Sequence, residues 1–260
     1  MERLDHETAG AGPALMLLPG TNSTARETWG ATLEALAEER TLILPELPGT
    51  RTPLDAPIDP AALAAALVDA ARAAGHERFA LAGASLGAPI ALVTAALHPD
   101  RVTHVVSVCG YSRARPGLDA RLALWDDLLD RDPAAVGTLL LILGMTDEVF
   151  AGTPDEALRA MADHLGRSRM PGIREQIALA RTIDAGPYLP RLPVPLLVVH
   201  GARDQFVHPA HSRVLAEAVP SARTLGLGGG HGLAHERAAE VGRAIVDFTA
   251  PAPEPVPAHE

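Results

Sequence analysis

The sequence contains no lysine, and all 22 of its basic residues are arginine. Acidic residues number 32, which gives a formal net charge of -10 at pH 7. This balance argues against a nucleic-acid-binding protein, because such proteins need positive charge to neutralise phosphates. Aromatic residues make up only 3% of the chain, so a surface on which bases or sugars stack is not expected. We therefore expect no nucleic-acid partner.

Cysteine and long hydrophobic runs are also scarce. The single cysteine, Cys109, excludes an intrachain disulfide framework and is most simply a small buried hydrophobic residue. No run approaches the roughly 18 apolar residues of a membrane-spanning helix. Residues 1–7 carry no apolar secretory segment. These absences predict a cytoplasmic protein without membrane contact.

Strand-length apolar runs alternate with helical segments over the first 110 residues. The runs that predict buried strands cover 14–18, 41–44, 79–84 and 103–109, and the alternation resumes with runs at 194–200 and 222–227. Such an order predicts an α/β fold, with a mainly parallel sheet, right-handed crossovers and helices on both faces. At 260 residues, one α/β domain with an insertion and two small domains are both compatible with the length.

The alternation is interrupted between residues 111 and 190, where the apolar spacing becomes helical. We expect this interval to be a helical cap, inserted between two segments of an α/β core at 1–110 and 191–250. Within it, 136–143 is unusually apolar, and this stretch either forms the insertion's own core or lines a substrate pocket. The proline-rich tail, 251–260, is expected to be disordered.

The segment Gly83-Ala84-Ser85-Leu86-Gly87 follows one of the predicted strands directly and precedes an apolar helical run. A glycine on each side of the serine lets the chain turn sharply and lets the strand and helix approach closely. By itself the Gly-x-Ser-x-Gly pattern is weak evidence, but the strand, turn and helix around it are the context that a nucleophile elbow requires. Ser85 is the candidate nucleophile.

From about residue 14 to residue 248, the chain resembles the α/β-hydrolase fold superfamily. The resemblance rests on Ser85, Asp204 and His231, which follow predicted strands in the family's order of nucleophile, acid and histidine. It implies a capped serine hydrolase of the esterase, lactonase or thioesterase type, with these residues as its catalytic triad. Asp204 could instead be an ordinary turn residue, and His235 is the rival for the histidine, although it is expected on the first turn of the last helix.

The resemblance also implies an oxyanion hole made of two backbone amides. Leu86 would supply one amide, and Thr21, in the loop after the first buried run, would supply the other. The role of Asn22 stays open between capping the turn and contributing its side-chain amide to the hole or to substrate binding. Tyr111 and Trp125 are further candidates for substrate binding, because they bring aromatic surface into the cap.

These residues favour a serine hydrolase that cleaves an ester, lactone or thioester bond of an apolar acyl small molecule through an acyl-enzyme. The alternatives are a non-hydrolytic enzyme of the same fold, namely an acyltransferase, cyclase or lyase, and a ligand-binding receptor. The histidines and acids lack paired metal-ligand spacing such as His-Glu-x-x-His, so no metal or cofactor is expected. The expected partner is the small-molecule substrate, and nothing in the sequence predicts the oligomeric state.

Overall fold

The computed structural model describes residues 3–250, and its centre is a seven-stranded sheet. The strand order is β1-β3-β2-β4-β5-β6-β7, and all neighbouring strands are parallel except β1 and β3. The strands are β1 (His6–Ala9), β2 (Ala14–Leu18), β3 (Thr41–Pro45), β4 (Phe79–Ala84), β5 (Val102–Val108), β6 (Leu196–Gly201) and β7 (Arg223–Leu227). The mainly parallel sheet that the sequence predicts is confirmed.

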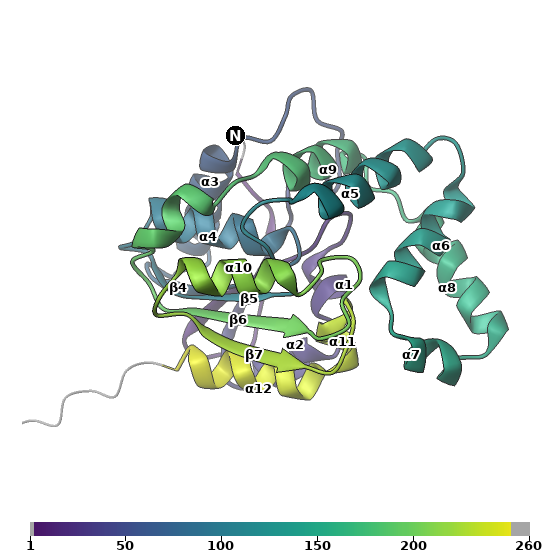
Figure 1. Cartoon of the computed structure of the whole chain (residues 1–260). Coiled ribbons are helices and arrows are strands. Elements are labelled where there is room, and N and C mark those ends of the chain that lie inside the picture. The colour runs from purple at the N-terminus through teal and green to yellow at the C-terminus, as the bar shows by residue number, and fades with distance from the viewer. Residues whose placement is uncertain (1–2, 251–260) are drawn as a thin grey trace, which may run out of the picture.

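The central strands are buried on both faces, which explains their nearly continuous apolar sequence. In β2, Met16 and Leu18 join one hydrophobic cluster, whereas Leu15 and Leu17 join a second cluster across the sheet. The first face is covered by α3 (Pro60–Ala73), α4 (Gly87–Leu97) and α10 (Ala210–Ala218) (Figure 1). The second is covered by α1 (Ala25–Trp29), α2 (Thr32–Ala37), α11 (Leu233–Glu236) and α12 (Ala238–Phe248).

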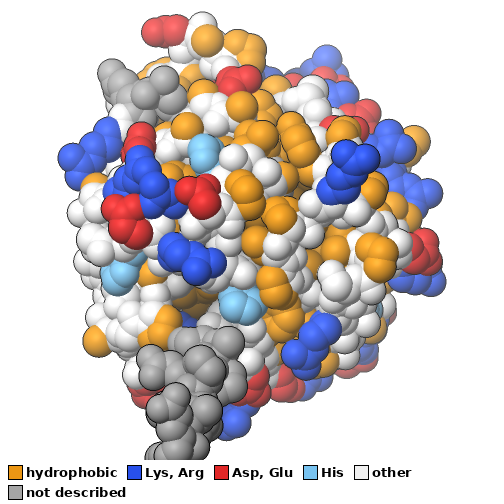
Figure 2. Space-filling view, turned by 90° about the vertical axis from the view of Figure 1, so that its left-hand side faces the viewer, with side chains coloured by type: hydrophobic (Ala, Val, Ile, Leu, Met, Phe, Trp, Pro, Cys, Tyr) orange, Lys and Arg blue, Asp and Glu red, His pale blue; other side chains and the backbone are white. Residues whose placement is uncertain are grey.

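The two edges at which the parallel strands begin and end differ in character. At the edge where the parallel strands begin, positively charged arginine and negatively charged acidic side chains lie among apolar ones (Figure 2). The loops after β2, β4, β6 and β7 lie together at the other edge, where parallel α/β sheets place their ligand sites. None of the helices within residues 3–250 has the length and apolar character needed to cross a membrane.

Five α-helices and a short 3-10 helix are inserted between β5 and β6, in the interval that the sequence analysis assigns to a cap. They are α5 (Pro116–Leu128), α6 (Pro133–Gly144), α7 (Asp147–Gly152), α8 (Asp155–Arg167), α9 (Ile173–Thr182) and η1 (Gly186–Arg191). The short α7 is not anticipated by the apolar spacing. The division into domains stays a prediction, and the tail 251–260 lies outside the described residues.

The inserted helices do not all project from the core. Buried side chains of α5 and α9, such as Leu122 and Ile177, belong to the same hydrophobic cluster as one face of the sheet. By contrast, α6, α7 and α8 extend away from the sheet as a lobe, and neither α7 nor α8 contains a buried residue (Figure 1). In the apolar stretch 136–143, Val136 joins the hydrophobic cluster of the sheet rather than a separate core of the insertion, while Leu140 and Leu141 line a cavity. That this cavity binds substrate stays a prediction.

Two glycines allow α6 and α8 to pack closely within the lobe. A Cβ atom on Gly137 would lie 1.8 Å from the carbonyl oxygen of Ala162, and one on Gly166 would lie 2.1 Å from the carbonyl oxygen of Pro133. Side chains at these positions would force the two backbones apart. The contact therefore depends on the glycines, and helix propensity would favour alanine at both positions.

We predict that Gly137→Val separates α6 from α8 and destabilises the protein by about 1–3 kcal/mol, the usual cost of overpacking. Thermal and urea unfolding measure the change. Gly152→Ala is the matched control, because a Cβ at Gly152 meets no atom within 4 Å. Equal stability of Gly137→Val and the wild-type protein would show that the α6–α8 contact is looser than the structure has it.

Candidate active site

Ser85 occupies a strained turn between β4 and α4. Its φ angle is +51°, in the left-handed region that residues other than glycine seldom adopt. Backbone hydrogen bonds hold it, because Ser85 N donates to the Val108 carbonyl at 3.0 Å and Ala88 N donates to the Ser85 carbonyl at 3.1 Å. A Cβ at Gly83 would lie 2.2 Å from the Gly87 carbonyl oxygen, so the turn needs the glycine at that position.

Asp204 and His231 form a hydrogen-bonded pair beside this turn. Nδ1 of His231 lies 2.8 Å from Oδ2 of Asp204, and since a carboxylate only accepts, Nδ1 is the donor. Asp204 is 2% exposed, and its Oδ1 accepts from the amides of Phe206 at 2.9 Å and Val207 at 2.8 Å. These bonds compensate the burial of the carboxylate and fix its orientation. The carboxylate in turn holds His231 with Nε2 directed away from Asp204.

Backbone and aromatic contacts fix the loop that carries His231. The amides of His231 and Gly232 both donate to the carbonyl of Gly144, the last residue of α6, at 3.0 and 3.2 Å. The Phe206 ring stacks on the imidazole, with ring centroids 5.0 Å apart and an interplanar angle of 29°. The position of His231 therefore depends on the lobe as well as on the sheet.

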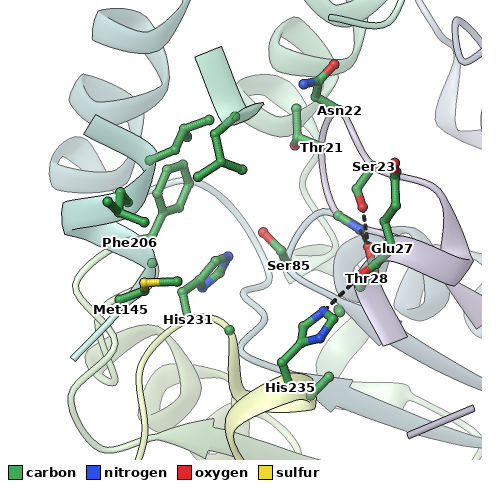
Figure 3. A pocket seen from close by; sticks show the side chains of 18 of the residues that line it. Thr21, Asn22, Ser23, Glu27, Thr28, Ser85, Met145, Phe206, His231 and His235 are labelled. Atoms are coloured by element: carbon green, nitrogen blue, oxygen red, sulfur yellow. Dashed lines mark hydrogen bonds between the residues drawn. The ribbon is translucent and has the colours of Figure 1, made fainter. Parts of the chain in front are cut away.

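Ser85 and His231 both line one cavity, where their side chains lie near one another (Figure 3). No hydrogen bond joins their side chains within residues 3–250, and catalytic hydrogen bonds are often long before substrate binds. The cavity has a volume of about 570 Å³. Its apolar wall comes mainly from the inserted helices and comprises Trp125, Leu140, Leu141, Met145, Val149, Met161 and Leu165, with Phe206 from the loop after β6.

Two backbone amides beside Ser85 donate no hydrogen bond to any part of the chain that the structure describes: Thr21 N and Leu86 N. The amides on either side of Thr21 are occupied, since Gly20 N donates to Oγ1 of Thr28 and Asn22 N donates to Oε1 of Gln176. Gly20 lies close to the serine, because a Cβ on it would be 4.0 Å from Ser85 Oγ. The two amides could thus serve as oxyanion donors, a role that stays a prediction.

His235 has a structural contact that distinguishes it from His231. Its Nε2 donates to the Glu27 carbonyl at 2.7 Å, and its ring lies where a Cβ on Gly30 would be. It lies in the short α11, not in the first turn of the last helix, α12. The imidazole joins α11 to α1 and reaches the cavity wall, but it makes no hydrogen bond to Asp204.

The three residues that the sequence suggests for substrate binding have different surroundings in the structure. Trp125 lines the cavity and meets Phe206 edge to face, with ring centroids 6.1 Å apart. Tyr111 is not among the lining residues, and its hydroxyl donates to the Ala180 carbonyl at 3.0 Å. Burial raises the pKa of this phenol above its usual value. Tyr111 is thus a core residue, which corrects its assignment to substrate binding.

Asn22 also lines the cavity, but its side-chain amide is already engaged. Nδ2 donates to the Ser168 carbonyl at 2.7 Å, and Oδ1 accepts from Met170 N at 2.9 Å. These bonds use one of the two N–H groups of Nδ2 and tie the side chain to the inserted segment, and its role as a third oxyanion donor stays a prediction. Phe206, which lines the cavity, and Gln176, which accepts from Asn22 N outside the cavity wall, are not anticipated from the sequence. A polar residue between Ile173 and Ile177, on the apolar face of α9, is the signal that could have indicated Gln176.

Cys109 stands next to the Asp204 and His231 pair. Ligand atoms of these three residues lie within 4.8 Å of one another, which is a spacing that a metal ion could bridge. Burial raises the pKa of the Cys109 thiol well above its usual value, so the thiol stays protonated. A protonated thiol is a poor metal ligand, and Asp204 and His231 already bond to one another. The donor set therefore fits a metal ion poorly.

Comparison with known proteins identifies the family. A family model described as alpha/beta hydrolase fold matches residues 13–238. The chain belongs to this family. Two solved structures of the same fold are an esterase from Thermogutta terrifontis and the enol-lactonase from Burkholderia xenovorans LB400. Their TM-scores are 0.75 and 0.81 at 22% and 21% identity, and the alignments cover 94% of this chain and 92% and 95% of theirs.

Two curated relatives of this α/β hydrolase carry hydrolase names. It is 27% identical over 230 residues to the pyrrolizixenacetamide deacetylase of Xenorhabdus hominickii, with 87% of this chain and 86% of that protein covered. It is 29% identical over 262 residues to the putative carbamate hydrolase RutD of Caulobacter sp. (strain K31), with 95% and 96% covered. The chain is thus an enzyme of the hydrolase type.

We predict that Asp204→Asn keeps the fold and lowers kcat by about 10³- to 10⁴-fold, because an amide nitrogen facing Nδ1 imposes the wrong histidine tautomer. Steady-state kinetics with an activated ester measure the loss, and circular dichroism tests the fold. Asp59→Asn is the control, because this aspartate caps α3 and does not line the cavity. Asparagine caps helices equally well. Activity of Asp204→Asn within about tenfold of wild type would assign the acid elsewhere.

Proposed function

We propose that the protein hydrolyses an ester, lactone or thioester bond of an apolar acyl small molecule through an acyl-Ser85 intermediate. The observation that carries this proposal is the hydrogen-bonded Asp204 and His231 pair, which shares one cavity with a serine held in a left-handed turn. Such strain is rare in loops without a function and is common at catalytic nucleophiles.

The proposed reaction begins with Ser85 Oγ. It bonds to the acyl carbon while its proton passes to Nε2 of His231, and Asp204 stabilises the imidazolium that forms. The amides of Thr21 and Leu86 would donate to the oxyanion. The bond to the leaving group then breaks, and the leaving group takes the proton from His231. Water repeats the sequence on the acyl-enzyme, which releases the acid and restores Ser85.

The lining of the cavity supports an apolar substrate. Leucine, methionine and valine side chains of the lobe, together with Trp125 and Phe206, form the apolar part of its wall. Burial of apolar surface gives binding energy in proportion to area, whereas a charged group would lose its hydration there. The names of the relatives include an amide and a carbamate hydrolase, so amide substrates belong beside esters in the test panel.

We predict that an alkyl fluorophosphonate labels one residue, Ser85, and that Ser85→Ala abolishes both labelling and ester hydrolysis. Mass spectrometry of the labelled protein locates the adduct. Ser168→Ala, which removes a second serine hydroxyl from the cavity wall, should leave labelling unchanged. Labelling that persists in Ser85→Ala would remove the elbow assignment. Labelling without turnover of any ester or amide would favour an acyltransferase, cyclase or lyase.

We predict that kcat/KM for p-nitrophenyl esters rises from acetate to hexanoate or octanoate, each buried methylene contributing up to about 0.8 kcal/mol. Leu140→Asn should flatten this dependence, because Leu140 lines the cavity. Leu124→Asn should not, because Leu124 is 46% exposed and lies outside the cavity wall. A series that peaks at acetate would contradict the apolar-acyl specificity and would leave the catalytic residues in place.

A further inference from the structure

We propose that Gln176, together with Asn22, is a positioning residue that aligns the Thr21 amide with the oxyanion formed at Ser85. The inference rests on the proposed function and assigns a role to a side chain that does not line the cavity. We call the hydrogen-bonded set of Asn22, Gln176 and the segment 168–170 the strap.

The strap acts on the loop 20–22, which follows β2. Two backbone amides of this loop donate hydrogen bonds. Gly20 N donates to Oγ1 of Thr28 at 3.2 Å, and Asn22 N donates to Oε1 of Gln176 at 2.8 Å. The amide of Thr21 lies between these two anchors and donates to no other group among the described residues. Its direction is therefore set by neighbours that are held in place on both sides.

Burial of a glutamine amide costs free energy unless the amide is hydrogen-bonded, and the contacts of Gln176 supply these bonds. It is 1% exposed and sits on α9 between Ile173 and Ile177, a position that the core would fill with a leucine. Both ends of its side-chain amide are satisfied, since Oε1 accepts from Asn22 N and Nε2 donates to the Pro48 carbonyl at 3.0 Å. Gln176 thus ties the loop after β2 to the loop after β3.

Asn22 adds the second part of the strap. Its φ angle is +57°, a conformation that asparagine and glycine tolerate better than other residues. Its side chain bridges the Ser168 carbonyl at 2.7 Å and Met170 N at 2.9 Å, between α8 and α9. Backbone and side chain of this one residue therefore make three hydrogen bonds to the inserted segment. The loop 20–22 is held by the insertion rather than by the sheet alone.

The alignment of a single amide has a large effect on acyl chemistry. A donor stabilises the oxyanion only when it points at the place where the negative charge develops, and removing one such donor costs about 10²- to 10³-fold in kcat. A misaligned amide loses part of that factor, while the neutral ground-state substrate loses little. Disruption of the strap should therefore lower kcat and leave KM nearly unchanged.

We test the strap with Gln176→Leu and Asn22→Gly, which remove its side chains; glycine also preserves the left-handed backbone at residue 22. For the preferred p-nitrophenyl ester we expect kcat to fall about ten- to hundredfold in each variant. The affinity for an octyl trifluoromethyl ketone, which forms a tetrahedral oxyanion on Ser85, should fall by the same factor. The double variant should lose little more than the worse single variant, because both substitutions act on one amide.

Arg174→Ala is the matched control on the same helix. Arg174 pairs with Asp126 and Asp130 of the α5 region and takes no part in the strap, so its loss should lower thermal stability without changing kcat or ketone affinity. Gln176→Glu keeps the acceptor for Asn22 N, and we expect it to retain more activity than Gln176→Leu, most clearly at acidic pH, where the carboxyl is neutral.

A purely structural strap would lower the melting temperature of Asn22→Gly and Gln176→Leu while kcat and ketone affinity stay within twofold of wild type, and that result would overturn the inference. If Gln176→Leu does not fold, Gln176→Glu tests Gln176, and Asn22→Gly tests the Asn22 side chain, whose half-buried loop position can lose it without leaving a core cavity. A wild-type protein that neither hydrolyses esters nor reacts with fluorophosphonate would overturn the proposed function as well, which separates the two failures.

Discussion

The arrangement of the site depends on the left-handed turn at Ser85. The turn exists because β4 and α4 meet at an angle that brings Gly83 against the backbone of Gly87, and Gly87 against the carbonyl of Leu18. A side chain at either glycine would push these backbones apart. Ser85 thus lies just beyond the carboxyl edge of the sheet. The loops after β2, β6 and β7 begin at the same edge and lie around this serine. Strain at a single residue is stabilised by close packing around it.

The sequence predicts those parts of the molecule that depend on local signals. Short apolar runs mark the parallel strands β2 to β7 and so place the elbow at Ser85 and the loops carrying Asp204 and His231, because parallel pairing brings the carboxyl ends of these strands to one edge. No apolar run marks the polar strand β1. The 2.8 Å contact between Asp204 and His231 has the geometry that the triad hypothesis needs. The roles of these residues in catalysis remain predictions.

Features that depend on contacts between distant segments are not predictable in this way. Tyr111 is aromatic and begins the insertion, which suggests a pocket residue, yet it follows β5 closely and its side chain is buried in the core. Gln176 lies 154 positions from Asn22, and no local pattern links the two. The short α7 lacks buried residues, so it leaves no apolar periodicity in the sequence. Each case requires the tertiary fold to be known first.

The carbonyl of Gly144 links the lobe to the loop that carries His231, although the lobe lies away from the sheet. Because the amides of His231 and Gly232 both bond to this one oxygen, an outward swing of α6 would have to break both bonds or carry the histidine loop with it. In the proposed mechanism, the position of α6 and the position of the His231 imidazole are thus mechanically coupled. If His231 is the base, as proposed, a molecule that displaced α6 would misplace the imidazole without touching Ser85.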